Sequence, residues 1–387
     1  MAEIECRHFN GYKPCGMSTE CNVSCPSRSL AGERILIVHL EALGAVLRST
    51  SLLAAVKRKY PRAHVTWITK APAHALLQNL VDVDRVLTTS SEDLLKLAAL
   101  EFDVALVIDK SLVAAGILQQ SRAKSIFGFK AHALTGAIIP ATRDAQELWQ
   151  IGLSDHKKFF ENSKTEQQLV HESLALGAYQ RDPYAVALSP TEQELATVRR
   201  ELWGRGQRPI IGINTGCSPT LPHKKLTVDG HRRLIDRILR SSLRGCPIVL
   251  LGGPEDTERN EAIARDLPVI LSPTTRGLRD GLASVAAVDL IFTGDSLGMH
   301  MAIGLGKWTV AWFGPSCQQE IDLYGRGRKI MTQAGCSPCW KRVCSKAVMC
   351  YDQVDFKQAV SALEEGFEWL TSSSKPRSPE ISFSPSL

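Results

Sequence analysis

Residues 289–300 read DLIFTGDSLGMH, an apolar run that passes through Gly294, Asp295 and Ser296 into residues at helical spacing. A strand followed directly by glycine and small polar residues places its carboxyl end beside a helix N-terminus, where backbone N–H groups and the helix dipole attract anions. The segment therefore predicts a site for phosphate groups or sugar hydroxyls. The alternative is that Asp295 or Ser296 only caps the helix.

The alternation of short apolar runs and helical stretches continues over both halves of the chain. Strand-like runs occupy 35–38, 64–68, 85–87, 104–109, 125–129, 209–214, 247–253, 268–271, 289–296 and 308–314. Helical stretches include 45–59, 76–77, 94–97 and 230–240, and residues 141–186 read as connecting helices. Short buried strands separated by helices indicate a parallel sheet covered on both faces. We therefore predict an α/β fold of two Rossmann-like, doubly wound domains that face a cleft, with ligands at the carboxyl ends of the strands.

Composition narrows the class of partner. The chain has 387 residues, 44% of them hydrophobic and 22% charged, and a net charge of +6. This mild positive excess favours anionic partners, but no dense basic helix or interleaved basic and aromatic stretch appears, so nucleic acid is not expected. No signal-peptide core and no run of about 18 apolar residues occurs, which predicts a cytoplasmic protein.

Polar or glycine-rich residues follow several second-half strands. Asn214, Thr215 and Gly216 follow one strand, residues 252–255 (Gly-Gly-Pro-Glu) follow another, and 294–296 follow a third. Glycine lets backbone amides approach a diphosphate, and an acidic residue at a strand end can hold ribose hydroxyls. Lys224 or Lys225 could reach a phosphate as a point charge.

The order of these segments resembles glycosyltransferase family 9, the heptosyltransferases. The resemblance rests on NTGCSPTLPHKKL (214–226), LLGGPED (250–256), GDSLGMHMAIGLGKWTVAWFGP (294–315) and, in the first half, RILIVHLEALGAVLRSTSLLAAVKRKYP (34–61). It covers about residues 33–350, and 294–315 is its most specific part. It implies the GT-B arrangement of two domains, with a C-terminal helix over 353–371 that packs back towards the first domain.

The resemblance implies a role for each residue of the donor site. Asp295 would hold sugar hydroxyls, and Ser296 would receive the diphosphate together with the amides of Leu297 and Gly298. His300 would support that turn from the helix, although a purely structural hydrogen bond is the alternative. In the other two loops, Thr215, Gly216 and Lys224 would contact phosphate and Glu255 the adenosine.

The first glycine loop departs from the family pattern. It reads EALGAVLRS, so Ala45 stands where the family has the aspartate expected to act as general base. Asp109 is the natural replacement, because VALVIDK ends a first-domain strand and turns its carboxylate towards the predicted cleft. The alternative is that Asp109 caps the turn before 112–118. Glu41 is a weaker base candidate, and Arg48 could hold an anionic acceptor.

The cysteines form two sets of four. Cys336, Cys339, Cys344 and Cys350 lie on one short loop and could close a tetrahedral iron or zinc site, with free or paired thiols as the alternative. A similar iron-binding cysteine loop is found in the autotransporter heptosyltransferase branch, which this loop resembles. The second set, Cys6, Cys15, Cys21 and Cys25, has irregular spacing. It leaves two possibilities equally open, a second metal or shared cluster and unpaired thiols.

The resemblance implies functions for the predicted domains. The domains are a Cys-rich extension (1–32), an acceptor-side domain with the connecting helices (33–186), a nucleotide-sugar-binding domain with the cysteine loop 336–350 (187–350), a C-terminal helix (351–372) and a disordered tail (373–387). The implied function is transfer of a heptose from ADP-heptose to a lipopolysaccharide core or protein, inverting and metal-independent at the chemical step. A catalytically silent sugar-nucleotide-binding or assembly protein is the alternative. The resemblance is also compatible with a homo-oligomer and with peripheral association at the inner face of the inner membrane.

Overall fold

The computed structural model describes residues 5–9, 11–207 and 209–372, so the tail predicted over 373–387 lies outside the described residues. The chain divides into two compact units. The first comprises Met1–Ala187 and Gln319–Ile321, and the second comprises Leu188–Gln318 and Asp322–Leu387. Among the described residues, no helix is long and apolar enough to cross a membrane.

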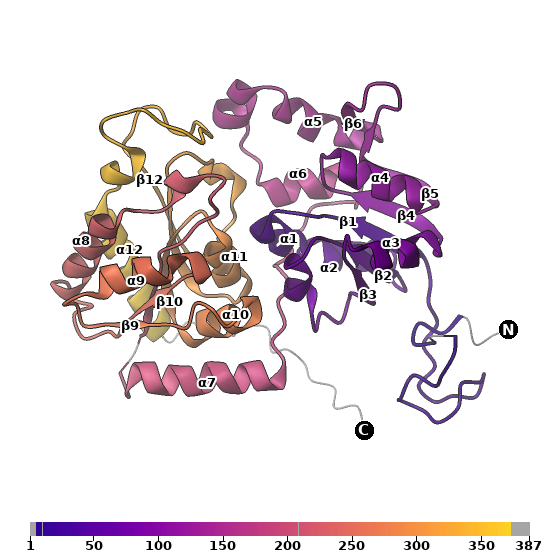
Figure 1. Cartoon of the computed structure of the whole chain (residues 1–387), viewed down its shortest axis with the longest axis horizontal. Helices are drawn as coiled ribbons and strands as arrows, with labels where there is room; N and C mark the ends of the chain where they lie inside the picture. Colours follow the sequence, from indigo (N-terminus) through magenta and orange to yellow (C-terminus); the bar gives the residue numbers. More distant parts are fainter. Residues whose placement is uncertain (1–4, 10, 208, 373–387) are drawn as a thin grey trace. The chain divides into compact units, whose positions relative to one another are not determined.

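The first unit is built on a six-stranded sheet in the order β3-β2-β1-β4-β5-β6 (Figure 1). Its strands are β1 (Arg34–Val38), β2 (His64–Ile68), β3 (Arg85–Leu87), β4 (Phe102–Val107), β5 (Ala123–Ala131) and β6 (Ile138–Pro140). All neighbours are parallel except β5 and β6. The five predicted strands of this half are confirmed, and β6 is an additional antiparallel edge that its short length concealed.

Helices join and cover these strands. They are α1 (Leu43–Ser49), α2 (Leu52–Lys59), α3 (Ser91–Ala98), α4 (Leu112–Gln120), α5 (Gln146–Gly152) and α6 (Glu166–Ser173). The single helical stretch predicted over 45–59 is two helices. Thr50 and Ser51 separate them, and their hydroxyls donate to the carbonyls of Leu47 and Arg48 at 2.7 and 2.9 Å. Such local side-chain bonds compete with a continuous helical ladder.

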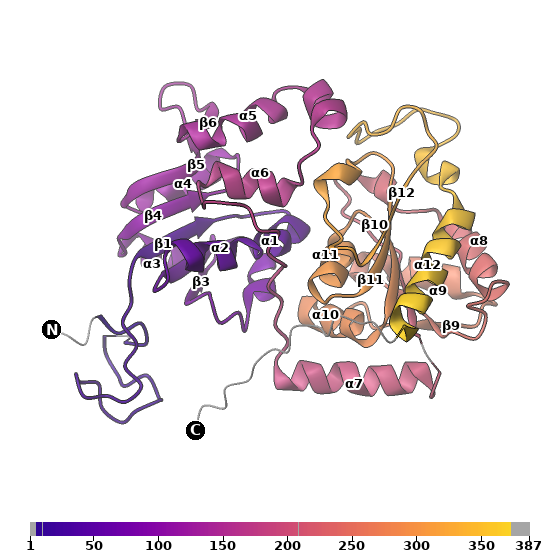
Figure 2. The same cartoon turned by 180° about the vertical axis from the view of Figure 1, so that it is seen from behind.

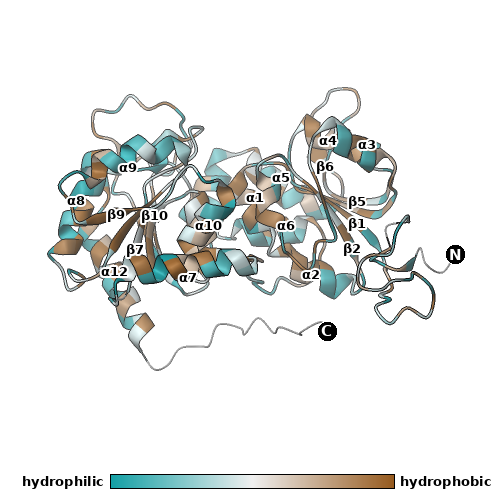
Figure 3. Ribbon diagram, turned by 60° about the horizontal axis from the view of Figure 1, so that its bottom comes forward, coloured by the Kyte–Doolittle hydropathy of each residue, from teal (hydrophilic) through white to brown (hydrophobic). Residues whose placement is uncertain are grey.

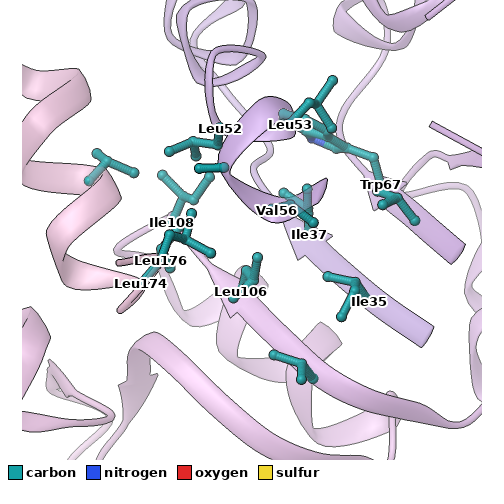
Figure 4. Close-up of a cluster of buried hydrophobic side chains, with 14 of the residues drawn as sticks. Ile35, Ile37, Leu52, Leu53, Val56, Trp67, Leu106, Ile108, Leu174 and Leu176 are labelled. Carbon is teal, nitrogen blue, oxygen red and sulfur yellow. The ribbon is translucent and has the colours of Figure 1, made fainter. Parts of the chain in front are cut away.

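The core of the first unit lies between its sheet and the helices (Figure 4). Ile35 and Ile37 of β1, Trp67 of β2 and Leu106 of β4 pack with Val56 of α2, and all are essentially buried. A parallel sheet with both faces covered needs such nearly continuous apolar strands. This core fixes β1 and β4 as neighbours in the middle of the sheet.

The second unit contains a fully parallel sheet in the order β12-β11-β10-β7-β8-β9 (Figure 2). Its strands are β7 (Ile211–Asn214), β8 (Ile248–Leu251), β9 (Val269–Leu271), β10 (Leu290–Gly294), β11 (Trp308–Phe313) and β12 (Gly327–Met331). The five predicted strands are confirmed. The sixth, GRKIM, was missed because charged residues interrupt its apolar pattern.

The helices of this unit are α7 (Pro190–Gly204), α8 (Val228–Leu239), α9 (Thr257–Ala264), α10 (Leu278–Ala287), α11 (Leu297–Gly304) and α12 (Phe356–Thr371). In α7, Ser189 forms a capping box with Glu192, which defines the helix start. Figure 3 shows that α7 carries both hydrophobic and hydrophilic residues along its length, whereas the strands β9 and β10 are hydrophobic.

The C-terminal helix corrects one expectation. We expected it to pack back towards the first domain, but α12 packs against α8, β10, β11 and β12 of the second unit. The indole of Trp308 donates to the Ala362 carbonyl at 2.8 Å, and a Cβ at Gly366 would lie 2.4 Å from that indole ring. Its apolar side, which includes Leu363, therefore completes the second core.

Both sheets reverse their strand order at one point. In the first sheet β1 lies between β2 and β4, and in the second β7 lies between β8 and β10. Loops that leave the carboxyl ends of the two central strands turn in opposite directions at such a point, which opens a crevice for ligands. The candidate residues after β1, β4, β7 and β10 all belong to these two switch points.

Candidate active site

Asp109 lies at the switch point of the first sheet, two residues after β4. Its carboxylate accepts a hydrogen bond from the backbone N–H of Leu40, which follows β1. The capping alternative is wrong, because Ser111 is the N-cap of α4 and its hydroxyl accepts from the Ala114 N–H at 3.2 Å. Asp109 is thus held by the backbone that follows β1 and does not cap α4.

The electrostatics of Asp109 suit a proton acceptor. Burial raises its pKa from 3.8 to about 6 and outweighs the Leu40 hydrogen bond and the charge of Lys110, which both lower it. Glu41, the weaker base candidate, has a mostly exposed side chain that pairs with Lys70 at 2.7 Å. A half-buried carboxylate with a pKa near 6 is ionised at neutral pH and still basic enough to take a proton.

Two further residues of this loop have structural partners. Ala45 lies within α1, so its methyl group gives the loop no carboxylate. Arg48, suggested as an acceptor-binding cation, is buried and pairs with Glu166 at 2.6 Å. The charges of Arg48, Lys110 and Lys158 hold the pKa of Glu166 below its usual value, although burial alone would raise it. The Arg48 charge is therefore already neutralised inside the first unit.

A hydrogen-bonded network joins the strand ends at the second switch point. The Asn214 amide, at the end of β7, donates to Ser296 Oγ at 3.0 Å and to Thr293 Oγ1 at 3.3 Å. It also reaches the Gly216 carbonyl at 3.0 Å. Ser296 occupies the N-cap position of α11 without a side-chain capping bond. Its hydroxyl instead ties β7 to β10, which leaves the first N–H groups of α11 without that cap.

Glycines make this edge compact. A Cβ at Gly294 would lie 1.9 Å from the Lys224 carbonyl oxygen, and one at Gly298 would lie 2.7 Å from the Asn214 side chain. A Cβ at Gly216 would lie 1.9 Å from an Asp256 carboxylate oxygen. A side chain at any of these three positions would collide with the neighbouring loop unless that loop moved. Glycine is therefore required for the loops to approach one another this closely.

Lys224 and Asp295 form the charged pair of this edge. Lys224 ends the short 3₁₀ turn Pro222–Lys224, and its Nζ lies 3.1 Å from Asp295 Oδ2. Both side chains are largely buried, with 14% and 13% exposure. Burial alone would raise the pKa of Asp295, but Lys224 and His300, one turn into α11, keep it below 3.8. Asp295 is therefore a charged hydrogen-bond acceptor. It does not cap α11, because Ser296 occupies the N-cap position of that helix.

Two predicted donor-site residues have surroundings that differ from those expected. Thr215 is fully buried, and its single hydroxyl hydrogen is shared between two acceptors in reach, the Leu251 carbonyl at 3.2 Å and the side-chain oxygen of Asn260. Its backbone N–H donates to the same carbonyl, so its polar hydrogens serve the β7–β8 pairing and not a phosphate. Glu255 is exposed on the turn Pro254–Asp256 after β8.

Asp256 is the acidic residue that the sequence analysis missed. Its carboxylate is buried, accepts from the Gly253 N–H at 3.0 Å and lies 3.8 Å from Lys225 Nζ. Burial raises its pKa, against the lowering effects of the Gly253 hydrogen bond and Lys225. The contact with Gly216 links the β7 and β8 loops, which explains why the two glycine-rich segments occur together. In the sequence, the signal for this residue was that a second acidic residue, Asp256, directly follows Glu255.

The C-terminal cysteines lie close enough to influence one another. Burial raises the pKa of Cys350 to about 11, and the charges of Cys339, Cys336 and Cys344 add to that rise. Lys346 hydrogen-bonds Cys336, and its pKa is raised. Four thiols on one loop are a donor set that iron and zinc accept. Within the described residues, however, no three His, Cys, Asp or Glu side chains meet at single-ion distances.

The second unit thus presents a helix N-terminus, a buried cation–carboxylate pair and close glycines at one strand edge. These features can bind a phosphate-linked sugar, and the first unit has a carboxylate with a raised pKa at the edge of its own sheet. Two doubly wound sheets with such edges are the architecture of GT-B glycosyltransferases. A family model, glycosyltransferase family 9 (heptosyltransferase), matches residues 95–349. The chain belongs to this family of glycosyltransferases.

Solved structures share the fold. A family 9 glycosyltransferase from Veillonella parvula DSM 2008 matches with a TM-score of 0.68 and 17% identity, covering 87% of this chain and 98% of that one. The ADP-heptose lipopolysaccharide heptosyltransferase II of E. coli has a TM-score of 0.61 and 18% identity, covering 86% and 99%. The iron-containing dodecameric glycosyltransferase TibC of enterotoxigenic E. coli has 0.52 and 10%, covering 88% and 77%. A search of curated proteins gives no sequence match.

Proposed function

We propose that the chain transfers a heptose from ADP-heptose to a hydroxyl of an anionic glycolipid, such as a lipopolysaccharide core, or of a protein. The observation that carries the donor assignment is the buried Lys224–Asp295 pair beside the N-terminus of α11. A structure of TibC in complex with ADP-D-β-D-heptose supports the choice of donor by family analogy.

The donor would use the edge formed by β7 and β10. Asp295 remains ionised and accepts hydrogen bonds from sugar hydroxyls, while Lys224 and the N–H groups of Leu297 and Gly298 approach the diphosphate. As the bond between the anomeric carbon and the diphosphate oxygen breaks, negative charge grows on the departing ADP. Those N–H groups and Lys224 stabilise that charge, so the chemical step needs no metal. Gly216 and Glu255 would complete the contacts, to phosphate and adenosine.

The acceptor hydroxyl would lose its proton to Asp109. Its oxygen attacks the anomeric carbon from the face opposite the leaving ADP, which inverts the configuration there. The new carbon–oxygen bond forms as the old one breaks, and the proton ends on the Asp109 carboxylate. A pKa of about 6 keeps this base ionised at neutral pH. The transfer requires that Asp109 and the donor reach the same hydroxyl.

A silent sugar-nucleotide-binding or assembly protein is the second candidate. Ala45 favours it, because α1 carries no carboxylate where the family base is expected. Such a protein would bind the donor at the β7–β10 edge but release no ADP in response to an acceptor. The two candidates therefore share a donor site and differ in turnover.

We further propose that Cys336, Cys339, Cys344 and Cys350 hold iron or zinc. The charges that these thiols exert on one another support this donor set, and TibC is described as iron-containing. A bound metal would supply cross-links for a loop that has no core of its own. The metal takes no part in the transfer step.

The setting of the reaction follows from the proposed substrates. A nucleotide-sugar donor and an anionic glycolipid acceptor call for action in the cytoplasm, at the inner face of the inner membrane. Peripheral association would suffice for such contact. TibC is dodecameric, which makes a homo-oligomer a reasonable expectation for this chain as well.

Two measurements test the proposed function. Thermal stabilisation by ADP-, UDP- and GDP-sugars identifies the donor, and we expect ADP-heptose to stabilise the protein most. ADP release is then measured with and without lipopolysaccharide core acceptors. Acceptor-dependent release supports the enzyme, and binding without release supports the silent protein. Stabilisation by none of the ADP-sugars would refute the donor assignment.

A further inference from the structure

The N-terminal extension, residues 5–32, carries four cysteines that the proposed transfer does not use. Cys6, Cys15, Cys21 and Cys25 all line one small pocket that is partly open to solvent. His8, Phe9, Asn22, Ser27 and Arg28 complete its wall. Four thiols from a single short segment therefore face the same space, although their spacing in the sequence is irregular.

The extension is folded with its apolar side chains outward. Tyr12, Met17 and Val23 are 85%, 52% and 59% exposed. Between residues 11 and 25, the only side chains that are partly buried are those of the three cysteines and Ser18. A segment that exposes its apolar residues and turns its cysteines inward has no hydrophobic core to hold it together. Small segments of this kind are usually stabilised by disulfides or metals, and these cysteines are free.

Regular structure does not replace that core. In the described part of the extension, β pairing is limited to an isolated bridge between Cys6 and Leu30. Tight turns follow two of the cysteines, because the Phe9 N–H donates to the Cys6 carbonyl at 3.0 Å and the Arg28 N–H to the Cys25 carbonyl at 3.1 Å.

Polar groups surround the sulfur of Cys6. The backbone of Ser29, His8 and Phe9 hydrogen-bonds it, and the guanidinium of Arg28 lies nearby. N–H groups and a cation around sulfur are the surroundings in which thiolates bind metals.

The base of the extension is anchored to the first unit. Arg7 donates to both carboxylate oxygens of Asp84, at 2.9 and 3.0 Å, and to the Ala63 carbonyl at 2.7 Å. The Ala31 N–H donates to the Glu5 carbonyl at 2.7 Å and so closes the loop. The extension is thus a closed loop with a fixed base and thiol-lined interior.

We propose that Cys6, Cys15, Cys21 and Cys25 bind a metal centre through four thiolates, separate from the C-terminal cysteine loop. No three metal-binding side chains in the described residues meet at single-ion distances. A single zinc ion would therefore draw the loops inward to bonds of about 2.3 Å, whereas an iron–sulfur cluster is a larger occupant. Both are thiolate-bound centres, and the experiment separates them.

The test compares metal content in four full-length forms prepared without oxygen or chelator. They are the parent, Cys15→Ser/Cys21→Ser, Cys339→Ser/Cys344→Ser and the combined variant. The C-terminal variant should keep about one zinc, or about four irons with matching acid-labile sulfide and visible absorption. The combined variant should lose this metal. A metal-free C-terminal variant, or equal metal in it and in the combined variant, would overturn the proposal.

A second measurement avoids variants that fail to fold. The native parent protein is treated with a thiol-alkylating reagent before and after a chelator, and the labelled cysteines are mapped by mass spectrometry. Cysteines 6, 15, 21 and 25 should resist alkylation until metal is removed. Cys246, a half-buried cysteine of the second unit, is the internal control whose labelling should not respond to the chelator. Disulfides within the N-terminal set, or labelling of these four cysteines that is the same with and without chelator, would contradict the proposal of an N-terminal metal centre. Absence of metal from the C-terminal loop would leave this result standing.

Discussion

The substitution Asp109→Asn separates proton transfer from donor binding. Asparagine keeps the size of the side chain and an oxygen that can accept from the Leu40 N–H, but it cannot take a proton at neutral pH. A positioned base contributes about 100-fold to 10,000-fold to such a step. We expect kcat at saturating donor to fall by that factor, while donor affinity, set at the β7–β10 edge, stays within about twofold.

The pH dependence of the parent follows from the same carboxylate. With a pKa of about 6, Asp109 is mostly ionised at pH 7 and mostly protonated at pH 5. The transfer rate should therefore rise with pH up to about 6 and level off above it, falling about tenfold for each pH unit below 6. In the Asp109→Asn variant, the residual rate should lose this inflection.

Stability should move in the opposite direction from activity. Because the folded-state pKa lies above the usual 3.8, the folded protein binds more protons than the unfolded chain between these values, and stability falls as pH rises from about 4 to 6. About two pKa units at 1.36 kcal/mol each give a cost of up to about 3 kcal/mol at pH 7. Asp109→Asn removes this cost, so it should stabilise the first unit at pH 7 and less so at pH 4.

Asp103→Asn is the matched control. Asp103 lies on the same strand, where it pairs with Arg34 and Lys124, and burial does not prevent those partners from lowering its pKa. This variant should lose stability at pH 7 and keep the parent transfer rate. Parent-like kcat in Asp109→Asn, or a rate that is flat between pH 5 and 7, would refute the assignment of the base. Activity that appears only after Ala45→Asp would identify the chain as a silent relative.

The remaining predictions concern the second unit. Asp295→Ala should weaken donor binding more than tenfold, because it removes hydroxyl acceptors and leaves Lys224 without its buried partner, as isothermal titration will show. Gly294→Ala should weaken donor binding and lower the melting temperature, because the methyl group would lie 1.9 Å from a carbonyl oxygen. Gly281 lies in α10, and a Cβ there would have no neighbouring atom within 4 Å, so Gly281→Ala should instead raise the melting temperature slightly. Cys339→Ser should remove the C-terminal metal, measured by elemental analysis.

The sequence predicted most of the fold because buried parallel strands are continuous apolar runs. The runs at 35–38 and 308–314 follow charged residues, and both form interior strands of their sheets. The missed strands β6 and β12 lie at sheet edges, where fewer side chains are buried and the apolar pattern weakens. The edge strands β3 and β9 were predicted, so it is the weak apolar pattern of β6 and β12, and not edge position alone, that concealed them.

The candidate site was predictable where it depends on strand ends, and less so where it depends on partners. The strand-end rule put Asp109 and Asp295 at the two switch points. It gave no means to foresee that Arg48 is neutralised by Glu166, more than a hundred residues away in sequence, or that Asp256 and not its neighbour is buried against the glycine loop. Those facts arise from packing between elements that are distant in the chain.

Asp109 and Asp295 show how one topology supports two different carboxylates. Each follows a central strand of its sheet, but burial dominates at Asp109 and raises its pKa to about 6, whereas Lys224 and His300 overcome burial at Asp295 and lower its pKa. The first carboxylate can therefore exchange a proton near neutral pH, and the second stays charged and can only accept hydrogen bonds. Opposite shifts in two otherwise similar groups are the pattern expected when one acts as a base and the other holds the substrate.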